Sequence, residues 1–331
     1  MKKLFLVVLL ITAVISAALV WKSETKKTLT PVTLAEVTHS IFYAPQYVAL
    51  NEGFFKEEGL DVHLLLRPGS DQVMHSLLAE EAQIGLSGSE TTIYQYEKNP
   101  KNYVQTFAGL TKRDGSFIVS RKKIAKFTLN DLKGKKIIGG REDGMPEMTL
   151  EWVLKKHGLN PRKDVKIDTS IPFADMKSEF LSGKGDFVIL FEPDALDVER
   201  HGYGYVVASV GALSDETHYT SYLARKSYLE NNPVIMKKFT KALAKGLLFV
   251  QENNSAVIAK SIAGQFPDLA RDDLIAIIDR YKAQDVWAKT PVLSYEAFQH
   301  MQEIMQAAGH LTKYADFRTL VNTAIAGEQG G

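Results

Sequence analysis

The sequence predicts an α/β fold built as two lobes, and three observations indicate it. Stretches typical of strands and of helices alternate over residues 32–212, which indicates βαβ units and largely parallel sheets. The sequence from Pro233 onward is almost entirely helical in pattern. Polar segments at 111–116 and 212–219 interrupt the alternation and are suited to carry the chain from one lobe to the other and back.

The positions of these polar segments define the predicted lobes. A chain that leaves lobe 1 at the first segment and returns at the second leaves a cleft between the lobes, where small ligands usually bind. The predicted boundaries are 32–113 plus 217–325 for lobe 1 and 114–216 for lobe 2.

The first block reads as four strands with helices between them. Its strands are predicted at 32–37, 61–68, 83–88 and 103–110. Its helices are predicted at 44–59, ended by Gly59, and at 71–82. Ser89 is a natural N-cap for a further helix that begins near Thr91, and Glu90 in its first turn suits the helix dipole.

The second block repeats the pattern with shorter elements. Its strands are predicted at 116–122, near the end of 127–140, and at 165–170, 186–193 and 202–209. Its helices are predicted at the start of 127–140, at 148–158 and at 173–184.

A glycine-rich turn, GGREDGMPE, leads into the helix at 148–158. A phosphate-binding loop requires Lys and then Ser or Thr after its last glycine, but Met145 and Pro146 stand at those positions. Pro146 and Glu147 suit the first turn of a helix, whose free amides attract polar or anionic groups. The turn is therefore either one wall of a ligand site or a plain strand-to-helix connection.

The N-terminus predicts export. Lys2 and Lys3 precede residues 4–21, which carry no charge, and small residues at 16–18 permit cleavage. We expect 1–21 to be a signal peptide or a membrane anchor, followed by a linker at 22–31. The protein would then be periplasmic, or anchored on the outer face of the cytoplasmic membrane.

Composition excludes several classes of function. The net charge is +1 and no long basic block occurs, so nucleic acid is not an expected partner. The chain has no cysteine, which excludes disulfides, thiolate metal sites and cysteine nucleophiles. Its eight histidines show no metal-binding spacing, and there is no G-x-S-x-G motif. We therefore expect no metal, no cofactor and no enzymatic activity.

Four segments together resemble one known family. They are HSIFYAPQYVALNEGFFKEEGLDV (39–62), QVMHSLLAEEAQIGLSGSET (72–91), GGREDGMPEMTLEWVLKKHGL (139–159) and DFVILFEPDA (186–195). The chain resembles the ABC-transporter solute-binding proteins that include sulfonate, taurine and thiamine-pyrimidine-precursor binders. The resemblance implies a type 2 periplasmic-binding-protein fold, in which each lobe is a mixed sheet flanked by helices and the lobes close on a ligand.

The same resemblance implies the partners and the alternatives. We expect a monomer that delivers a small molecule to the permease and ATPase of an ABC importer. A related enzyme branch makes the thiamine pyrimidine from its own histidine and a bound pyridoxal, but it carries a cysteine cluster that this chain lacks. A sensor held by the N-terminal segment is a further alternative.

Loops that follow strands face the cleft in this fold, and they supply the candidate ligand-binding residues. These are Thr38, His39, Phe42, Tyr43, Ser87, Gly88, Ser89, Arg113, Gly144, Met145, Phe191 and Glu192. We expect aromatic rings to stack on a planar ligand, with one of Phe42 and Tyr43 in the core instead. A carboxylate at Glu192 would bind the amine of a thiamine pyrimidine precursor, unless it is bonded to a helix end or a basic side chain. A sulfonate would instead use Arg113 or Arg141.

Overall fold

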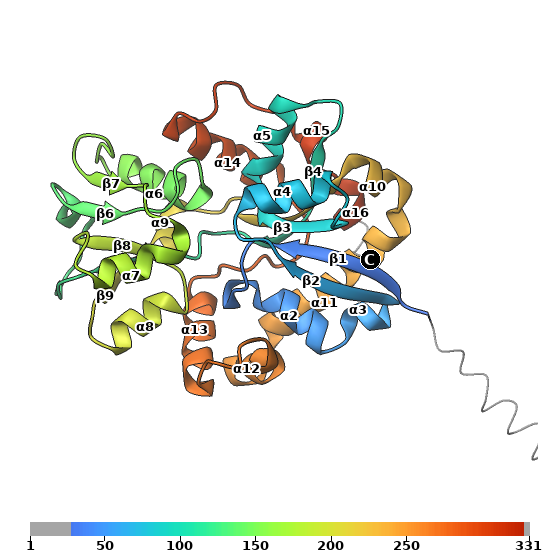
Figure 1. The fold of residues 1–331 in the computed structure, drawn as a ribbon, viewed down its shortest axis with the longest axis horizontal. Helices are drawn as coiled ribbons and strands as arrows, with labels where there is room; N and C mark the ends of the chain where they lie inside the picture. Colours follow the sequence, from blue (N-terminus) through green and yellow to red (C-terminus); the bar gives the residue numbers. More distant parts are fainter. Residues whose placement is uncertain (1–27, 328–331) are drawn as a thin grey trace, which may run out of the picture.

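The computed structural model describes residues 28–327, which form two five-stranded sheets flanked by helices (Figure 1). The predicted signal or anchor segment, 1–21, lies outside the described residues. Strand β1 already begins at Thr30, so the end of the predicted linker belongs to the fold. Within the described residues, no helix combines the length and the apolar character needed to cross a membrane.

The first sheet has the strand order β2-β1-β3-β10-β4. Its strands are β1 (Thr30–Glu36), β2 (Leu60–Leu66), β3 (Ile84–Gly88), β4 (Val104–Thr111) and β10 (Thr220–Arg225). β1 pairs in parallel with β2 and β3, whereas β10 runs antiparallel between β3 and β4. We call this sheet and its helices lobe 1, formed by 28–111 and 220–327.

The second sheet repeats that order as β7-β6-β8-β5-β9. Its strands are β5 (Phe117–Ser120), β6 (Lys136–Ile138), β7 (Lys166–Asp168), β8 (Phe187–Leu190) and β9 (Tyr205–Ser209). β5 runs antiparallel between β8 and β9, as β10 does in the first sheet. We call this part lobe 2, formed by 117–209. Each sheet is therefore mixed, with its one antiparallel insertion at the corresponding place.

The helices between the strands differ in length from the sequence pattern: those predicted at 71–82 and 173–184 are shorter, whereas the one predicted at 148–158 begins earlier, at Met145. They are α2 (Ala44–Asn51), α3 (Phe54–Glu57), α4 (Ser70–Leu78), α5 (Glu90–Lys98), α6 (Met145–Lys156), α7 (Met176–Leu181), α8 (Asp194–Arg200) and α9 (Val210–Ser214). The predicted helix at 44–59 is two helices, because Gly53 adopts a left-handed φ of 79° between them. The predicted strand at 186–193 ends at Leu190, and the chain then turns into α8, which the sequence pattern did not indicate.

Helices after β10 complete lobe 1 and also reach lobe 2. They are α10 (Lys226–Asn231), α11 (Pro233–Glu252), α12 (Ser255–Ile262), α13 (Arg271–Ala283), α14 (Tyr295–Ala308), α15 (Phe317–Leu320) and α16 (Thr323–Ala326). α11 packs on α2, whereas α14 packs on α6 of lobe 2. Figure 1 shows α13 and α14 on opposite sides of the region where the lobes meet.

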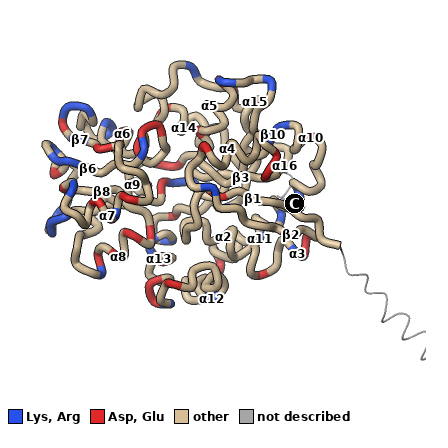
Figure 2. The backbone as a smooth tube through the Cα atoms, viewed as in Figure 1, with Lys and Arg blue, Asp and Glu red and all other residues tan. Residues whose placement is uncertain are grey.

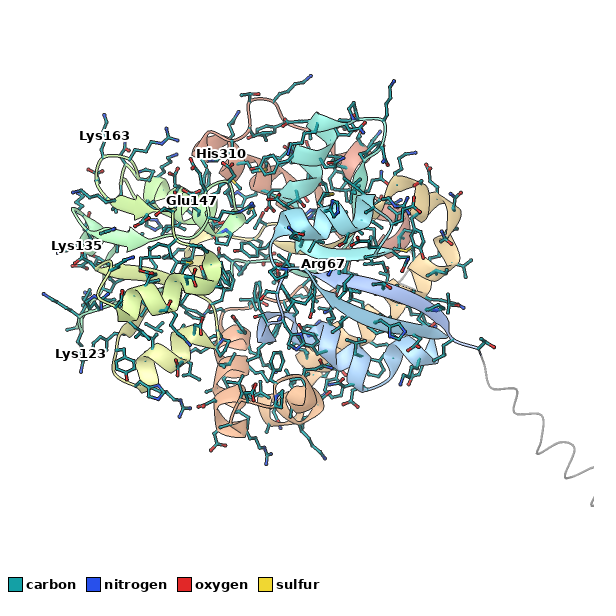
Figure 3. The ribbon with its side chains drawn as sticks, in the orientation of Figure 1. Arg67, Lys123, Lys135, Glu147, Lys163 and His310 are labelled. Carbon is teal, nitrogen blue, oxygen red and sulfur yellow. The ribbon has the colours of Figure 1, made fainter. Side chains whose placement is uncertain are left out.

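Side-chain contacts hold α14 against lobe 2. His310, just after α14, pairs with Asp143 at 2.6 Å, and the ring of His300 lies against Trp152 of α6. Figure 3 labels Glu147 on α6 and His310 in this region. Burial raises the pKa of Glu147 to about 8, and the neighbouring acidic side chains contribute to that rise. Across the whole molecule, both signs of charge are distributed over both lobes (Figure 2).

The two segments that cross between the lobes, 112–116 and 210–219, are bonded to each other. The Thr217 amide donates to the Lys112 carbonyl at 2.9 Å, and the Tyr219 hydroxyl donates to the Asp114 carboxylate at 2.8 Å. A Cβ on Gly211 would lie 2.0 Å from the Asp114 carbonyl oxygen, so only glycine permits this approach. The crossings therefore form one packed hinge.

Candidate functional site

The lobes meet where the ends of β3 and β8 face the start of α6. Most residues predicted to line the cleft are buried here: Phe42, Tyr43, Ser87, Ser89, Met145 and Glu192 are all less than 4% exposed. The lobe junction, by which we mean the β3–α5 turn, the start of α6 and the aromatic cluster described below, is thus closed in this structure.

The β3–α5 turn presents polar atoms that have no partner. Among the described residues, the hydroxyls of Ser87 and Ser89 and Oε2 of Glu90 are buried without a hydrogen bond. Ser89 is the N-cap residue of α5, as the sequence predicted, but its hydroxyl makes no capping bond to the helix. The backbone carbonyl of Ser89 instead accepts from Thr92. The side chain of Ser89 is therefore not used by its own helix.

Glu90 is the charged group of this turn. Its side chain is folded back over Gly88, where an added Cβ would lie 2.2 Å from Oε2. Burial raises the pKa of Glu90 to about 7, and the backbone amides of Glu90 and Met145 and the charge of Arg141 lower it only in part. The Met145 amide belongs to lobe 2, so the Glu90 carboxyl faces the start of α6 across the junction.

The glycine-rich turn is what brings the start of α6 to this place. Gly140 and Asp143 adopt left-handed φ values of 90° and 65°, which reverse the chain before the helix. Gly144 is the extended residue at the start of α6, and an added Cβ would meet the Arg141 carbonyl at 3.2 Å and Cδ of Pro146 at 3.7 Å. The Arg141 side chain pairs with Asp71 of lobe 1 at 2.8 Å, at the exposed rim.

An aromatic cluster forms the other side of the junction. The ring centroid of Phe42 lies 5.6 Å from that of Tyr43, 5.7 Å from Phe191, 5.9 Å from Tyr219 and 5.3 Å from Tyr281. Phe191 comes from lobe 2 and is half-buried, so rings from both lobes meet. Both Phe42 and Tyr43 are buried, whereas the sequence predicted one of them in the core.

Glu192 is bonded within the protein. Oε1 accepts from Arg280 of α13 at 2.8 Å, and Oε2 accepts from the Leu196 amide of α8 at 2.8 Å. Burial raises the pKa of Glu192, and the charge of Arg280 and the Leu196 amide offset part of that rise. Both oxygens thus have partners, as the alternative interpretation of Glu192 required, and the carboxylate is not free to accept from a ligand amine in this arrangement.

Three further candidates lie in other surroundings. His39 is held between Glu36, at 2.7 Å, and the Gln265 carbonyl, at 3.0 Å, which occupies both ring nitrogens. Thr38, before it, is half-buried in the same loop. Arg113 pairs with Glu216 at 3.1 Å and so joins the two crossings of the hinge. The structure gives His39 and Arg113 partners within the chain, and their predicted ligand contacts stay predictions.

Several junction residues were missed by the sequence analysis. Tyr219 and Tyr281 are brought to Phe42 from distant segments, and no local pattern marked them. Glu90 was assigned only to the helix dipole. A signal for it existed, because Glu90 follows a buried strand end at the same interval as Glu192, the residue that the sequence analysis chose.

Neither a metal nor the pyridoxal branch finds matching residues here. Among residues 28–327, no group of three or more His, Asp and Glu side chains could hold a metal ion. His39 has partners on both ring nitrogens, whereas His218, beside Tyr219 of the aromatic cluster, is buried with neither nitrogen bonded. The chain has no cysteine, so it does not fit an enzyme branch that carries a cysteine cluster. A cavity of about 450 Å³ lies elsewhere, in lobe 2, lined by residues such as Phe127, His157 and Leu213.

Comparisons with known proteins identify the family of the chain. A family model described as NMT1/THI5 like matches residues 41–256. A protein of Bacillus subtilis (strain 168) named "Putative binding protein YtlA" is 44% identical over 301 residues, covering 91% of this chain and 90% of that one.

Solved structures with this fold include binding proteins for small anions. The alkanesulfonate-binding protein SsuA from Xanthomonas axonopodis pv. citri, bound to MOPS, aligns with a TM-score of 0.70 at 17% identity, covering 88% of this chain and 98% of that one. The periplasmic nitrate-binding protein NrtA from Synechocystis PCC 6803 aligns with a TM-score of 0.68 at 17% identity, covering 91% and 88%. At such identities the likeness establishes the fold and leaves the ligand open.

Proposed function

The chain belongs to the NMT1/THI5-like family, and from this premise we propose that it is an exported solute-binding protein that delivers a small, planar, amine-bearing molecule to an ABC importer. The observation that carries the proposal is the lobe junction. There, unpartnered polar groups of one lobe, the first turn of a helix from the other, and rings from both converge. We expect a monomer that works with a membrane permease and an ATPase.

Lobe closure is the proposed mechanism. A ligand that bonds the β3–α5 turn and packs on Phe191 contacts both lobes at once, so it stabilises the closed form relative to the open one. The hinge formed by 112–116 and 210–219 would bend as one unit, because its segments are bonded to each other. The permease would then recognise the closed form. Solution scattering should record a smaller radius of gyration when ligand is added to the ligand-free protein.

The alternative ligand is a small anion, and the start of α6 favours it. Free amides and the positive end of the helix dipole bind sulfonate-type groups well. The sulfonate and nitrate binders that share the fold support this alternative.

Calorimetry on ligand-stripped protein tests the proposed function. The panel is a 4-amino-5-hydroxymethyl-2-methylpyrimidine, taurine, an alkanesulfonate and nitrate, and we expect the aminopyrimidine to bind tightest. Phe191→Ala should weaken that binding about tenfold, since stacked rings contribute roughly 0.5–1.5 kcal/mol beyond burial. Phe54→Ala is the matched control, because Phe54 is also half-buried and packs edge-on against another ring, 6.4 Å from Phe249. Binding of no solute, or equal loss in both variants, would contradict the proposal.

A further inference from the structure

The charge balance of the junction points to the ligand's charge. Within residues 28–327, the buried charged or titratable side chains include Glu90, Asp114 and Glu192, whereas no Lys or Arg is buried. Asp114 accepts from Tyr219 and from the Ser116 amide, and Glu192 has Arg280. Glu90 alone among these three carboxyls has an oxygen without a partner.

Glu90 occupies the position at the start of α6 where a bound anion would lie. The first amides of α6 and its positive dipole end attract negative charge, and the Glu90 carboxyl already faces the Met145 amide there. The nearby basic side chains do not give an anion a substitute for those amides. Arg141 is half-exposed and bonded to Asp71, and Arg113 is bonded to Glu216 in the hinge. Above about pH 7, an anion that entered would meet an ionised carboxylate at close range.

The rings beside Glu90 suit a cation. The Ser89 amide, next to Glu90, donates to the Tyr219 carbonyl at 3.4 Å. Burial is the main cause of the raised pKa values of Tyr43 and Tyr219, and the charge of Glu90 adds to both. Both belong to the aromatic cluster around Phe42. Ring faces attract organic cations, and a carboxylate with a free oxygen accepts from their N–H groups.

We propose that Glu90 selects the ligand by charge, and that the ligand is a small planar organic cation whose N–H groups bond to Oε2 of Glu90. This inference rests on the proposed function and narrows it: among amine-bearing molecules it favours the cationic ones, and it excludes the sulfonate class.

Three probes with the same ring test the selection: benzamidinium, benzamide and benzenesulfonate, which differ in charge at one substituent. Calorimetry at pH 8 keeps Glu90 ionised, because its pKa is about 7. The wild-type protein should bind benzamidinium at least tenfold more tightly than benzamide, and benzenesulfonate more weakly than either. Glu90→Gln should reduce that preference to threefold or less, mainly through weaker binding of benzamidinium.

Two further variants make the result decisive. Glu90→Asp keeps the charge and should retain a preference for the cation, which separates charge from shape. Glu97→Gln removes an exposed carboxylate of the same helix and should change nothing. Circular dichroism of each variant checks that it is folded.

The outcomes separate this inference from the proposed function. A wild-type protein that prefers benzenesulfonate, or a Glu90→Gln variant that keeps the full preference for benzamidinium, overturns the inference while the protein remains a solute-binding protein. A wild-type protein that binds the aminopyrimidine of the earlier panel but none of these probes also overturns it. Binding of no solute in either panel overturns both.

Discussion

Glu90 and Glu192 occupy corresponding places in the two lobes and have opposite environments. Each lies two positions beyond a central parallel strand, β3 ending at Gly88 and β8 ending at Leu190, and each is 2% exposed. Glu192 is bonded to Arg280 and to the Leu196 amide. Glu90 has an oxygen with no hydrogen-bond partner, and its carboxyl faces the Met145 amide of the other lobe.

The difference shows how one topology serves two purposes. In lobe 2 the buried carboxylate attaches the β8–α8 turn to α13, so it holds the closed arrangement of the protein itself. In lobe 1 the corresponding carboxyl carries an energetic cost that a ligand can remove, since a buried charge is expensive until it is paired. A buried acid is therefore a candidate ligand contact only when the chain supplies no donor for it.

Removing the partner of Glu192 should have the largest effect. Arg280→Met keeps the apolar stem but leaves Glu192 buried and without its ion pair, which should lower the free energy of unfolding by about 3 kcal/mol. Urea denaturation at pH 7 measures it. Arg200→Met is the matched control, because Arg200 pairs with Asp273 between the same two helices, with a half-exposed side chain, and should cost less than about 1 kcal/mol.

Equal losses in these two variants would mean that Glu192 does not depend on Arg280. Glu192 would then not be a carboxylate that needs its partner within the chain, and its contrast with Glu90 would not hold.

Glu90→Gln should raise the free energy of unfolding, whereas Arg280→Met should lower it. The size of the increase should depend on pH. Between pH 4.5, the ordinary value, and about 7, the unfolded chain releases the Glu90 proton while the folded ligand-free chain retains it. The raised pKa thus makes the wild type lose stability as pH rises through this window. The variant lacks that loss, so its advantage should grow to about 3 kcal/mol by pH 8.

Thermal or urea unfolding of both proteins from pH 5 to pH 8 checks this. Other titrating groups are shared, so the difference curve isolates Glu90. Glu192→Gln should lose about 1.5 kcal/mol at pH 8 instead, since its hydrogen bonds to charged groups are used by the protein. A Glu90→Gln variant that is less stable than the wild type at pH 8 would place Glu90 in the same structural class as Glu192.

The smallest effect concerns the serine before Glu90. Ser89→Ala should change the free energy of unfolding by less than about 0.5 kcal/mol, because its hydroxyl makes no bond in the ligand-free protein. Ser209→Ala should cost about 1 kcal/mol, because Ser209 caps α9 by accepting from the Ala212 amide at 3.1 Å. Parallel urea titrations measure both, and a Ser89→Ala loss as large as that of Ser209→Ala would show that the β3–α5 turn depends on this hydroxyl for its own stability.

The sequence was sufficient for the fold because the fold depends on local periodicity. Alternating strands and helices, a restart of the pattern and helical C-terminal stretches predicted two α/β lobes, and the family resemblance implied the mixed sheets that both lobes contain. Element lengths were overestimated where strands are short: β5 is Phe117–Ser120 where 116–122 was predicted, and β7 is Lys166–Asp168 where 165–170 was predicted. In such strands the apolar pattern continues into the adjoining turns, so it does not mark the ends.

The candidate site was predictable only in part, because a partner decides what a polar residue does. Glu192 attracted the ligand hypothesis since Arg280, its partner, lies far along the chain on a helix whose position no local pattern reveals. The same holds for Arg113 and Glu216. Glu90 was assigned to the helix dipole since acidic residues are common in first turns, and only its burial distinguishes it.

The positions of the two ends of the described chain determine where the protein can be tethered and labelled. β1 starts at Thr30, and the Asn322 amide beside α16 donates to Thr106 of β4, so both ends leave from lobe 1, away from lobe 2 (Figure 1). A tether or a fused reporter at either end is therefore attached to lobe 1, and in the proposed closure lobe 2 would move relative to it. A fluorophore pair placed at the two ends would not report closure, because both fluorophores would lie on lobe 1. One label on lobe 2 is needed, and Lys163→Cys at its exposed outer end offers a unique thiol, because the chain has no cysteine of its own.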